Sequence, residues 1–327
     1  MRCKTSVVIV SYNNFDITTG PCLDSLLVNG EQREFEIIVV DNASSDKTPE
    51  MLKKIAVEYD RVKVILNKTN RGFAGGNNDG VSAASGDVII LLNSDTLVPA
   101  GSMEKLSALL LKNREWGLLS PSTNEAGNEQ KIYTQGRDPR SILEQGVSWC
   151  LHSNEDWFES ERLDFFCVGM KKRLYEDLGG LDEIFGLGYY EDTDFSIKAA
   201  QKKIKMIYTE DVFVYHQAGK SFSKHGRKAV KKLMKTNKKI LIRKHGNTFK
   251  LHHIRDRNLM VLKGYTERIG IKKEDADYRK NLLYKFERRI KLAKTFYPNN
   301  PLKKMKYRFA LKKIKKKFTE NVKTIYG

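Results

Sequence analysis

The chain has 327 residues, of which 40% are hydrophobic and 30% charged. It therefore has enough apolar side chains for a sizeable core, which excludes a wholly disordered chain. At about 150 residues per domain, this length indicates one large or two modest domains. No run approaches the roughly 18 uncharged apolar residues that a membrane span needs. The four cysteines show no metal-type spacing, so we expect buried thiols in a reducing compartment, the cytoplasm.

The charge is distributed unevenly along the chain. Residues 221–327 hold 34 Lys and Arg against 7 Asp and Glu, whereas residues 1–220 hold 25 against 33. We therefore expect two parts, a mildly acidic body over 1–220 and a basic helical region over 221–327. Such a basic region is typical of chains that meet an anionic partner: a membrane surface, a nucleic acid or an acidic protein.

In the body, short apolar runs alternate with helical patterns, which predicts an α/β fold with a mostly parallel sheet. The expected strands are 6–10, 36–40, 62–66 and 87–92, and the expected helices are 22–28, 49–59 and 77–84. Each strand stops at polar residues. Because ligands of open α/β sheets bind at the carboxyl ends of the strands, residues 11–14, 41–42 and 93–95 should line one crevice.

The first strand is followed by Ser-Tyr-Asn-Asn and not by Gly-x-Gly-x-x-Gly, so a nicotinamide or flavin site is not expected. Asp41 can accept hydrogen bonds from a ribose or base, or simply form a turn. The glycine-rich segment 70–80, with Arg71 inside it, suits close approach to a phosphate at a helix start, although a plain loop explains it too. Asp95 can bind a divalent cation or cap the next helix.

Together these residues resemble a known family. The segments that carry the resemblance are 6–12, 39–45 (Val-Val-Asp-Asn-Ala-Ser within it), 70–77, the Leu-Leu-Asn-Ser-Asp-Thr stretch, and 189–197 with Tyr-Tyr-Glu-Asp-Thr-Asp-Phe. In this order they are similar to family 2 glycosyltransferases of the GT-A fold, including bacterial polysaccharide and rhamnosyl-type transferases. The resemblance covers about residues 5–220.

The resemblance implies an inverting transfer of a sugar from a nucleoside diphosphate, UDP or dTDP, to an acceptor hydroxyl. The acceptor would be a cell-surface polysaccharide or a lipid-linked glycan. The family's nucleotide-binding positions fall on Ser11, Tyr12, Asp41, Arg71, Gly72, Gly75 and Asn93.

The family's metal-binding DxD motif reads Asn93-Ser94-Asp95 here, so only Asp95 keeps a carboxylate. His216 matches a histidine that some members use as a metal ligand. The resemblance thus implies Mn²⁺ or Mg²⁺ held by Asp95 and His216. A hydrogen-bonded structural histidine is the alternative interpretation.

The segment Glu191-Asp192-Thr193-Asp194 matches the family's Glu-Asp motif, which places the catalytic base at Asp192. Its neighbours Glu191 and Asp194, together with Gly169 in the acceptor-side segment 165–170, are expected to contact the acceptor. An acidic cap on a helix over 193–203 explains the same residues structurally. Residues 121–160 show little periodicity and are expected to form a substrate loop or lid, with Trp149 and Trp157 more suited to core packing.

The basic region contains helical patterns over 224–245 and 283–294, a linker at 297–301, and a last helix over 302–325. The last helix has an apolar stripe among lysines, made of Leu302, Met305, Phe309, Ile314, Phe318, Val322 and Ile325. This pattern favours an anionic membrane surface, with the protein peripheral on the inner face of the cell membrane. Docking on the body or on a twin subunit, in a homodimer, is the alternative.

Two other functions remain open from the sequence. A nucleic-acid-binding protein could use the basic region with Tyr284, Phe286, Tyr307 and Phe309 as stacking groups, although the crevice carboxylates would then have no use, and we expect no nucleic-acid partner. A catalytically inactive nucleotide-sugar-binding module would explain the missing first carboxylate of the DxD-like motif.

Overall fold

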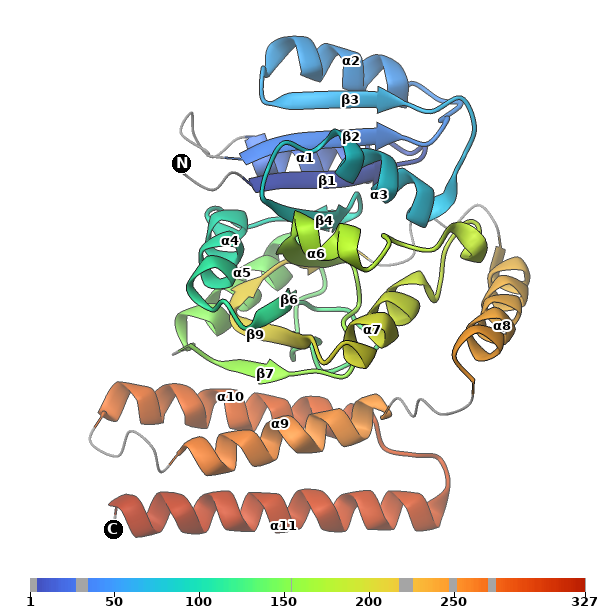
Figure 1. Ribbon diagram of the computed structural model, residues 1–327. Helices are drawn as coiled ribbons and strands as arrows, with labels where there is room; N and C mark the ends of the chain where they lie inside the picture. Colours follow the sequence, from blue (N-terminus) through green and yellow to red (C-terminus); the bar gives the residue numbers. More distant parts are fainter. Residues whose placement is uncertain are drawn as a thin grey trace.

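The computed structural model describes residues 5–27, 35–153, 155–217, 226–246, 252–269 and 275–326. A central eight-stranded sheet has the order β3-β2-β1-β4-β8-β6-β9-β7 and carries helices on its faces (Figure 1). The predicted α/β fold, mostly parallel and followed by helices, is thereby confirmed.

The first half of the sheet is parallel. Its strands are β1 (Thr5–Ser11), β2 (Phe35–Asp41), β3 (Val62–Leu66) and β4 (Val88–Asn93), joined through α1 (Thr19–Leu27), α2 (Thr48–Glu58) and α3 (Gly72–Ala83). All four strands lie where the sequence predicts them. For β1, β2 and β4 the reason is that an inner strand covered on both faces must be a continuous apolar run, whereas β3 is the edge strand and is mostly not buried. The third helix begins five residues earlier than predicted, so most of the glycine-rich segment is helical.

The second half contains the change of strand direction. Strand β8 (Cys167–Lys171) runs antiparallel to both β4 and β6 (Trp116–Ser122), while β9 (Lys205–Phe213) is parallel to β6. The remaining elements are β5 (Thr96–Leu97), α4 (Ser102–Lys112), α5 (Pro139–Leu151), β7 (Trp157–Glu159), α6 (Lys172–Asp177), the 3₁₀ helix η1 (Glu183–Phe185), α7 (Glu191–Gln201) and β10 (Tyr215–His216).

The segment 121–160 is not one long loop, so that part of the prediction was wrong, although its residues 125–127 line the cavity described below. It contains α5, whose start is fixed by Asp138, which accepts a hydrogen bond from the Ser141 amide, and by Pro139 in the first turn. An Asp-Pro pair at a helix start is a recognisable signal. Trp149 is 1% exposed and packs in the core as expected. Trp157 is partly exposed and packs against Trp116.

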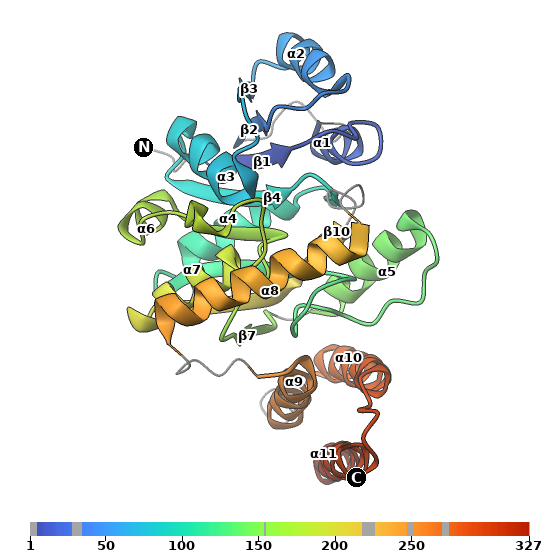
Figure 2. The ribbon, with the colours of Figure 1, turned by 90° about the vertical axis from the view of Figure 1, so that its right-hand side faces the viewer.

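The described residues of the basic region form the helices α8 (Gly226–His245), α9 (Ile254–Arg268), α10 (Ala276–Thr295) and α11 (Pro301–Tyr326). The sequence analysis did not predict α9. Helix α8 runs along the body, and α9, α10 and α11 form a layer beyond β7 (Figures 1 and 2). None of the described helices has a stretch long and apolar enough to span a bilayer.

The apolar stripe predicted for the last helix is split between two faces. Ile314 and Phe318 are buried with residues of α9 and α10, and Val322 is partly buried there. Leu302, Met305 and Phe309 are instead exposed. The side chain of Ile325 lies outside the described residues. Packing of α11 inside the protein therefore accounts for the second half of the stripe only.

A buried ionic cluster joins α9 and α10 to β9. Glu210 of β9 accepts a hydrogen bond from the Tyr265 hydroxyl (2.5 Å) and pairs with Arg289 (2.5 Å) and Lys285 (3.1 Å). Lys285 also pairs with Asp156 at 2.7 Å. The side chains of Glu210, Lys285 and Arg289 are fully buried, so each charge depends on its partners for compensation.

We predict that Glu210→Ala will destabilise the protein by about 3–5 kcal/mol, since it leaves two buried cations without their shared carboxylate. Denaturant unfolding of the full chain measures the change. Glu144→Ala, which removes an exposed carboxylate paired with Arg140, is the control and should change stability by less than about 0.5 kcal/mol. Equal effects of the two substitutions would contradict a supporting role for the cluster.

Candidate active site

A cavity of about 630 Å³ opens at the carboxyl end of β4. Its walls come from the end of β4, the loops before α5 and β8, the first turn of α7, β10 and α8. The lining residues are Phe73, Asn93, Glu125, Ala126, Gly127, Arg162, Asp164, Phe165, Phe166, Gly188, Tyr189, Tyr190, Glu191, Asp192, Thr193, His216 and Met234. Four of the predicted site residues, Asn93, Glu191, Asp192 and His216, therefore line one cavity.

The short strands β5 and β10 bring Asp95 and His216 together. They pair antiparallel with His216 opposite Thr96, the residue after Asp95. His216 Nε2 then lies 3.4 Å from Asp95 Oδ1. Burial disfavours the charged imidazole, but the hydrogen bond and charge of Asp95 outweigh it and raise the pKa of His216. The predicted pair thus meets in space although 121 positions separate the two residues along the chain.

The surroundings of this pair suit a divalent cation. His216 Nδ1 lies 3.1 Å from the carbonyl of Glu125, to which it donates in the tautomer that leaves Nε2 free to bind. Asn93 Oδ1 is buried and accepts no hydrogen bond from the described residues. A carboxylate, an imidazole and an amide oxygen are acceptable ligands for Mn²⁺ or Mg²⁺. Among the described residues, no group of three or more His, Cys, Asp or Glu side chains is arranged to hold a metal ion by itself.

Two adjacent carboxyl groups line the cavity at the start of α7. Asp192 Oδ1 accepts hydrogen bonds from the Thr193 amide (2.6 Å) and hydroxyl (3.1 Å). Glu191 is 7% exposed, and its Oε2 has no partner in the described part of the chain. Burial, with the charge of Asp192, raises the pKa of Glu191 to about 8. Burial also raises the pKa of Asp192, although the Arg162 guanidinium opposes this shift. Of the two carboxyl groups, Asp192 is the one whose ionised form is better stabilised, because it accepts hydrogen bonds and has a cationic neighbour, Arg162.

The loop before α7 is held in place by α8. Tyr189 and Tyr190 have positive φ angles of 73° and 83°, a conformation that non-glycine residues adopt only under constraint. The side-chain amide of Asn237, in α8, donates to the carbonyls of Phe185 (2.7 Å), Gly188 (2.8 Å) and Tyr189 (3.0 Å). Asn237 therefore fixes the turn that presents Asp192.

The predicted nucleotide residues at the ends of β1 and β2 lie outside the lining of this cavity. Ser11 is fully buried and shares a hydrogen bond with the Thr19 hydroxyl, so it is not available to a nucleotide. Tyr12 is half-buried in the loop after β1. Asp41 accepts the Ser44 amide through Oδ2, as a turn former does, while its Oδ1 is buried without a partner in the described residues.

The glycine-rich segment packs against η1, and the structure gives it a structural role. Arg71 forms ion pairs with Asp79 and, through two hydrogen bonds of 2.8 and 2.9 Å, with Glu183. A side chain at Gly72 would meet the Gly186 carbonyl at 2.0 Å, and one at Gly75 would crowd the Arg71 side chain at 2.7 Å. These contacts explain the glycines without a phosphate.

Two further predicted acceptor residues face away from the cavity. Asp194 is fully buried and pairs with His245 (2.6 Å) and Lys244 (2.7 Å) of α8. Gly169 lies within β8, opposite Ile90 and Leu119, where a larger side chain would meet Leu110. We therefore withdraw both from the acceptor site, since their surroundings are protein interior.

Sequence reasoning missed Arg162, Asp164 and Asn237. Arg162 pairs with Asp164 at 2.8 Å, and both line the cavity beside Asp192. They precede β8 in a stretch without periodicity, and no motif marks them. The only signal for Asn237 is an uncharged polar residue in the middle of a lysine-rich helix.

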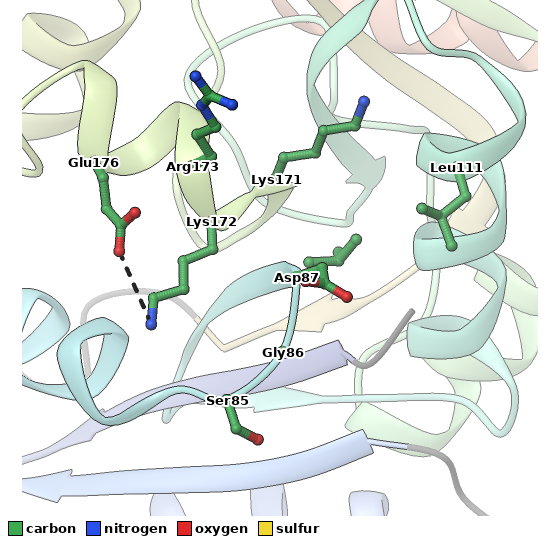
Figure 3. A pocket seen from close by; sticks show the side chains of 9 residues that line it. Ser85, Gly86, Asp87, Leu111, Lys171, Lys172, Arg173 and Glu176 are labelled. Carbon is green, nitrogen blue, oxygen red and sulfur yellow. Dashed lines mark ion pairs between the residues drawn. The ribbon is translucent and has the colours of Figure 1, made fainter. Parts of the chain in front are cut away.

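A second hollow, of about 470 Å³, lies at the other end of β4 (Figure 3). Its basic residue Lys172 donates to the Ala84 carbonyl and pairs with Glu176 at 3.9 Å. Lys171, Arg173 and Asp87 complete its charged lining. These charges come from α6, the end of β8 and the residue before β4, and the lining includes none of the predicted site residues.

Comparison with known proteins places these observations in a family. The model of glycosyl transferase family 2 matches residues 6–174, more than half of the chain. The chain belongs to this family. It is therefore a glycosyltransferase of the GT-A fold, as the sequence motifs indicate.

Curated relatives are also glycosyltransferases. The chain is 36% identical over 114 residues to the glycosyltransferase EpsE of Bacillus subtilis, covering 35% of this chain and 40% of EpsE. It is 31% identical over 220 residues to the GalNAc(5)-diNAcBac-PP-undecaprenol beta-1,3-glucosyltransferase of Campylobacter jejuni, covering 64% of this chain and 66% of that enzyme. The chain thus spans less than half the length of EpsE.

Solved structures agree on the fold. The crystal structure of GalNAc-T7 with UDP, GalNAc and Mn²⁺ aligns with a TM-score of 0.59 at 15% identity, covering 92% of this chain and 58% of that one. The mannosyltransferase PcManGT of Pyrobaculum calidifontis, in complex with GDP-Man and Mn²⁺, aligns with a TM-score of 0.52 at 18% identity, covering 95% and 74%. At these identities the likeness concerns the fold alone.

We predict that Glu191→Gln will stabilise the protein at alkaline pH. The folded-state pKa of Glu191 lies above its ordinary value of 4.5, at about 8. Its contribution to stability is therefore fully present below about pH 4.5 and is lost as the pH rises to about 8. Glutamine stays neutral, so the stability difference between the variant and the parent should grow across this window.

Thermal unfolding of both proteins from pH 4 to about pH 9 measures this difference, which should reach on the order of 1–3 kcal/mol. Glu144→Gln, at an exposed position, is the matched control. Parallel stability curves for Glu191→Gln and the parent would show that Glu191 ionises at its ordinary pKa.

Proposed function

We propose that the protein transfers a sugar from a nucleoside-diphosphate sugar to an acceptor hydroxyl with inversion at the anomeric carbon. The observation that carries the proposal is that Asp192 and His216 line one cavity, and that Asp95 lies 3.4 Å from His216. A donor held at the pair would thus have its sugar within the same enclosed space as a candidate base.

Asp192 is the proposed base. Its Oδ1 is anchored by Thr193, which fixes the carboxylate in one orientation and leaves Oδ2 to accept the proton of the acceptor hydroxyl. Burial raises the pKa of this group, which makes it a better proton acceptor than an exposed carboxylate. As the proton leaves, the acceptor oxygen attacks the anomeric carbon from the side opposite the departing diphosphate.

Glu191 supports this step by staying neutral. With its pKa raised to about 8, it carries a proton near neutral pH. The pair then bears a single negative charge, on the residue with hydrogen bonds and the Arg162 guanidinium nearby. A protonated Glu191 can also donate a hydrogen bond to a sugar hydroxyl through its unpartnered Oε2.

Asp95 and His216, with the free amide oxygen of Asn93, are the proposed ligands of a divalent cation, Mn²⁺ or Mg²⁺. Such a cation supplies neutralisation of the charge that develops on the leaving diphosphate. The Mn²⁺ in two solved structures of the same fold supports this assignment. The chain's own contribution is to orient His216 through the Glu125 carbonyl and to keep Asp95 buried beside it.

Of the seven predicted nucleotide-binding positions, Tyr12 and Asp41 are proposed to contact the nucleoside, and Asn93 is proposed to lie beside the diphosphate. Asp41 has a buried oxygen that no described residue satisfies, and a ribose or base hydroxyl or amide can donate to it. The donor is proposed to be a UDP- or dTDP-sugar, on the family resemblance.

The acceptor is proposed to be a lipid-linked glycan or a growing surface polysaccharide. The relative from Campylobacter jejuni, which acts on an undecaprenol-linked glycan by its name, supports the lipid-linked alternative. A lipid-linked acceptor would require the enzyme to work at the inner face of the cell membrane, as a peripheral protein.

We predict that Asp192→Asn will lower the turnover number by about 10²–10⁴-fold, the usual contribution of a general base. The amide preserves the shape and one acceptor oxygen, so donor binding should be retained. Transfer assays with a panel of acceptors, with donor binding followed by thermal shift, measure both quantities. Undiminished transfer would eliminate Asp192 as the base. No transfer by the parent to any acceptor would favour an inactive nucleotide-sugar-binding module.

We predict that UDP or dTDP will raise the melting temperature more with Mn²⁺ than without it, because a ligand that binds only the folded state stabilises it by mass action. His216→Ala and Asp95→Asn should each abolish the Mn²⁺-dependent part of the shift. Asp192→Asn, which leaves this end of the cavity intact, is the control. A shift that is equal with and without Mn²⁺ would contradict the proposed cation site.

A further inference from the structure

Helix α11 has two opposite faces with different surroundings. Tyr307, Leu311, Ile314 and Phe318 follow the three-to-four spacing of one helix face and are 3–7% exposed. They pack with residues of α9 and α10, and the Phe318 ring stacks on Phe286 with 3.7 Å between centroids. This face anchors α11 to the rest of the protein.

The opposite face carries three large apolar side chains in solvent. Leu302, Met305 and Phe309 are 67%, 61% and 69% exposed. At 100° per residue, these three positions lie about half a turn away from the buried set. Single exposed apolar residues are ordinary, but three neighbours on one helix face form a patch that needs a partner.

Basic residues surround this patch. Helix α11 holds ten Lys and Arg and one Glu. Lys306 and Lys313 lie on one flank of the patch along the helix and Arg308 and Lys312 on the other, all of them exposed. Both views place α11 in the outermost layer of the molecule, with α9 and α10 between it and the sheet (Figures 1 and 2). A planar partner can therefore approach this face.

We infer that α11 docks on an anionic bilayer surface through Leu302, Met305 and Phe309, with the flanking lysines on lipid headgroups. An apolar strip bordered by cations matches the boundary between acyl chains and anionic headgroups. The charge argues against a second copy of the chain, because a symmetric dimer through this face would bring two strongly basic helices into contact.

A nucleic acid fits the same face less well. Its phosphates would pair with the lysines, but the apolar patch would remain in contact with water. Of the four aromatic residues that suggest base stacking, Phe286 and Tyr307 are buried, and Tyr284 stacks on His152 with 3.9 Å between centroids. Phe309 alone is exposed among them. The structure therefore removes most of the stacking surface that this alternative needs.

The purpose of this docking rests on the proposed function. Docking would hold the enzyme beside a lipid-linked acceptor. The buried ionic cluster of Glu210, Lys285 and Arg289 fixes α10 to the sheet, and α11 packs on α9 and α10. A bilayer bound at α11 would thus hold the catalytic body in a fixed position relative to the membrane.

The test uses the full chain and vesicles of phosphatidylcholine with or without phosphatidylglycerol, without donor or acceptor. The parent should co-sediment with phosphatidylglycerol-containing vesicles and detach as salt is raised. A triple variant, Leu302→Gln, Met305→Gln and Phe309→Gln, keeps helix propensity and should bind at least about tenfold more weakly. Lys312→Gln with Lys313→Gln should weaken binding and lower its salt dependence.

The matched control is Val57→Gln with Leu151→Gln, at apolar positions 86% and 76% exposed on other helices, and it should bind as the parent does. Equal binding of the triple variant and the parent, or no preference for phosphatidylglycerol, would overturn the inference. So would a dimer in vesicle-free buffer that the triple variant abolishes, or preference for single-stranded DNA at matched salt. Asp192→Asn should still bind vesicles, so failure of the proposed chemistry and failure of docking are separable.

Discussion

The reversal of strand direction between β4 and β8 is the constraint on which the site depends. Strands β1 to β4 all point their carboxyl ends at one edge, and β8 begins at that same edge, with Cys167 opposite Leu92. The backbone N–H of Asn93 donates to the backbone carbonyl of Phe166 at 2.8 Å, and this hydrogen bond ties the end of β4 to the start of β8. The loops on both sides of this junction diverge, and the cavity lies between them, as expected at a switch point in an α/β sheet.

The cavity is completed by a helix from outside the resemblance to the family. Met234 of α8 lines it, and Asn237 of the same helix holds the strained turn before Asp192. Asp194 adds a buried ionic link from α7 to Lys244 and His245 at the end of α8. Residues on both sides of position 220, where the charge balance changes, therefore build the cavity and hold the turn that carries the proposed base.

The sequence predicts the four strands of the first half of the sheet and one part of the site well, for a physical reason, whereas the strands of the second half were not predicted. Buried parallel strands must be apolar runs, and the polar residues that end them must meet, which locates Asn93 and Asp95. What it does not reveal is which polar groups face inward. Asp194 and Arg71 look like ligands for a sugar or a phosphate in the sequence, but each is neutralised by residues about 50 or more positions away. Helix α5 was missed because its apolar pattern is weak, although Asp138 and Pro139 mark its start.

The positive charges of residues 221–327 fall into two groups in the structure: some pair with carboxylates of residues 1–220, and others lie on the surface. Arg257 and Arg268 of α9, with Lys285 and Arg289 of α10, are paired with Glu129, Asp156 and Glu210 of the body. Three carboxylates of residues 1–220 are thus matched to four cations of α9 and α10. Within the described part of the chain, no ion pair joins the lysines of α11 to residues 1–220, and the single carboxylate on that helix pairs with its own Lys316. Helix α8 is also strongly basic, but α11 combines its positive charge with a patch of three exposed apolar side chains on one face. The coincidence of the two on one outer face is what a contact with an anionic, partly apolar surface requires.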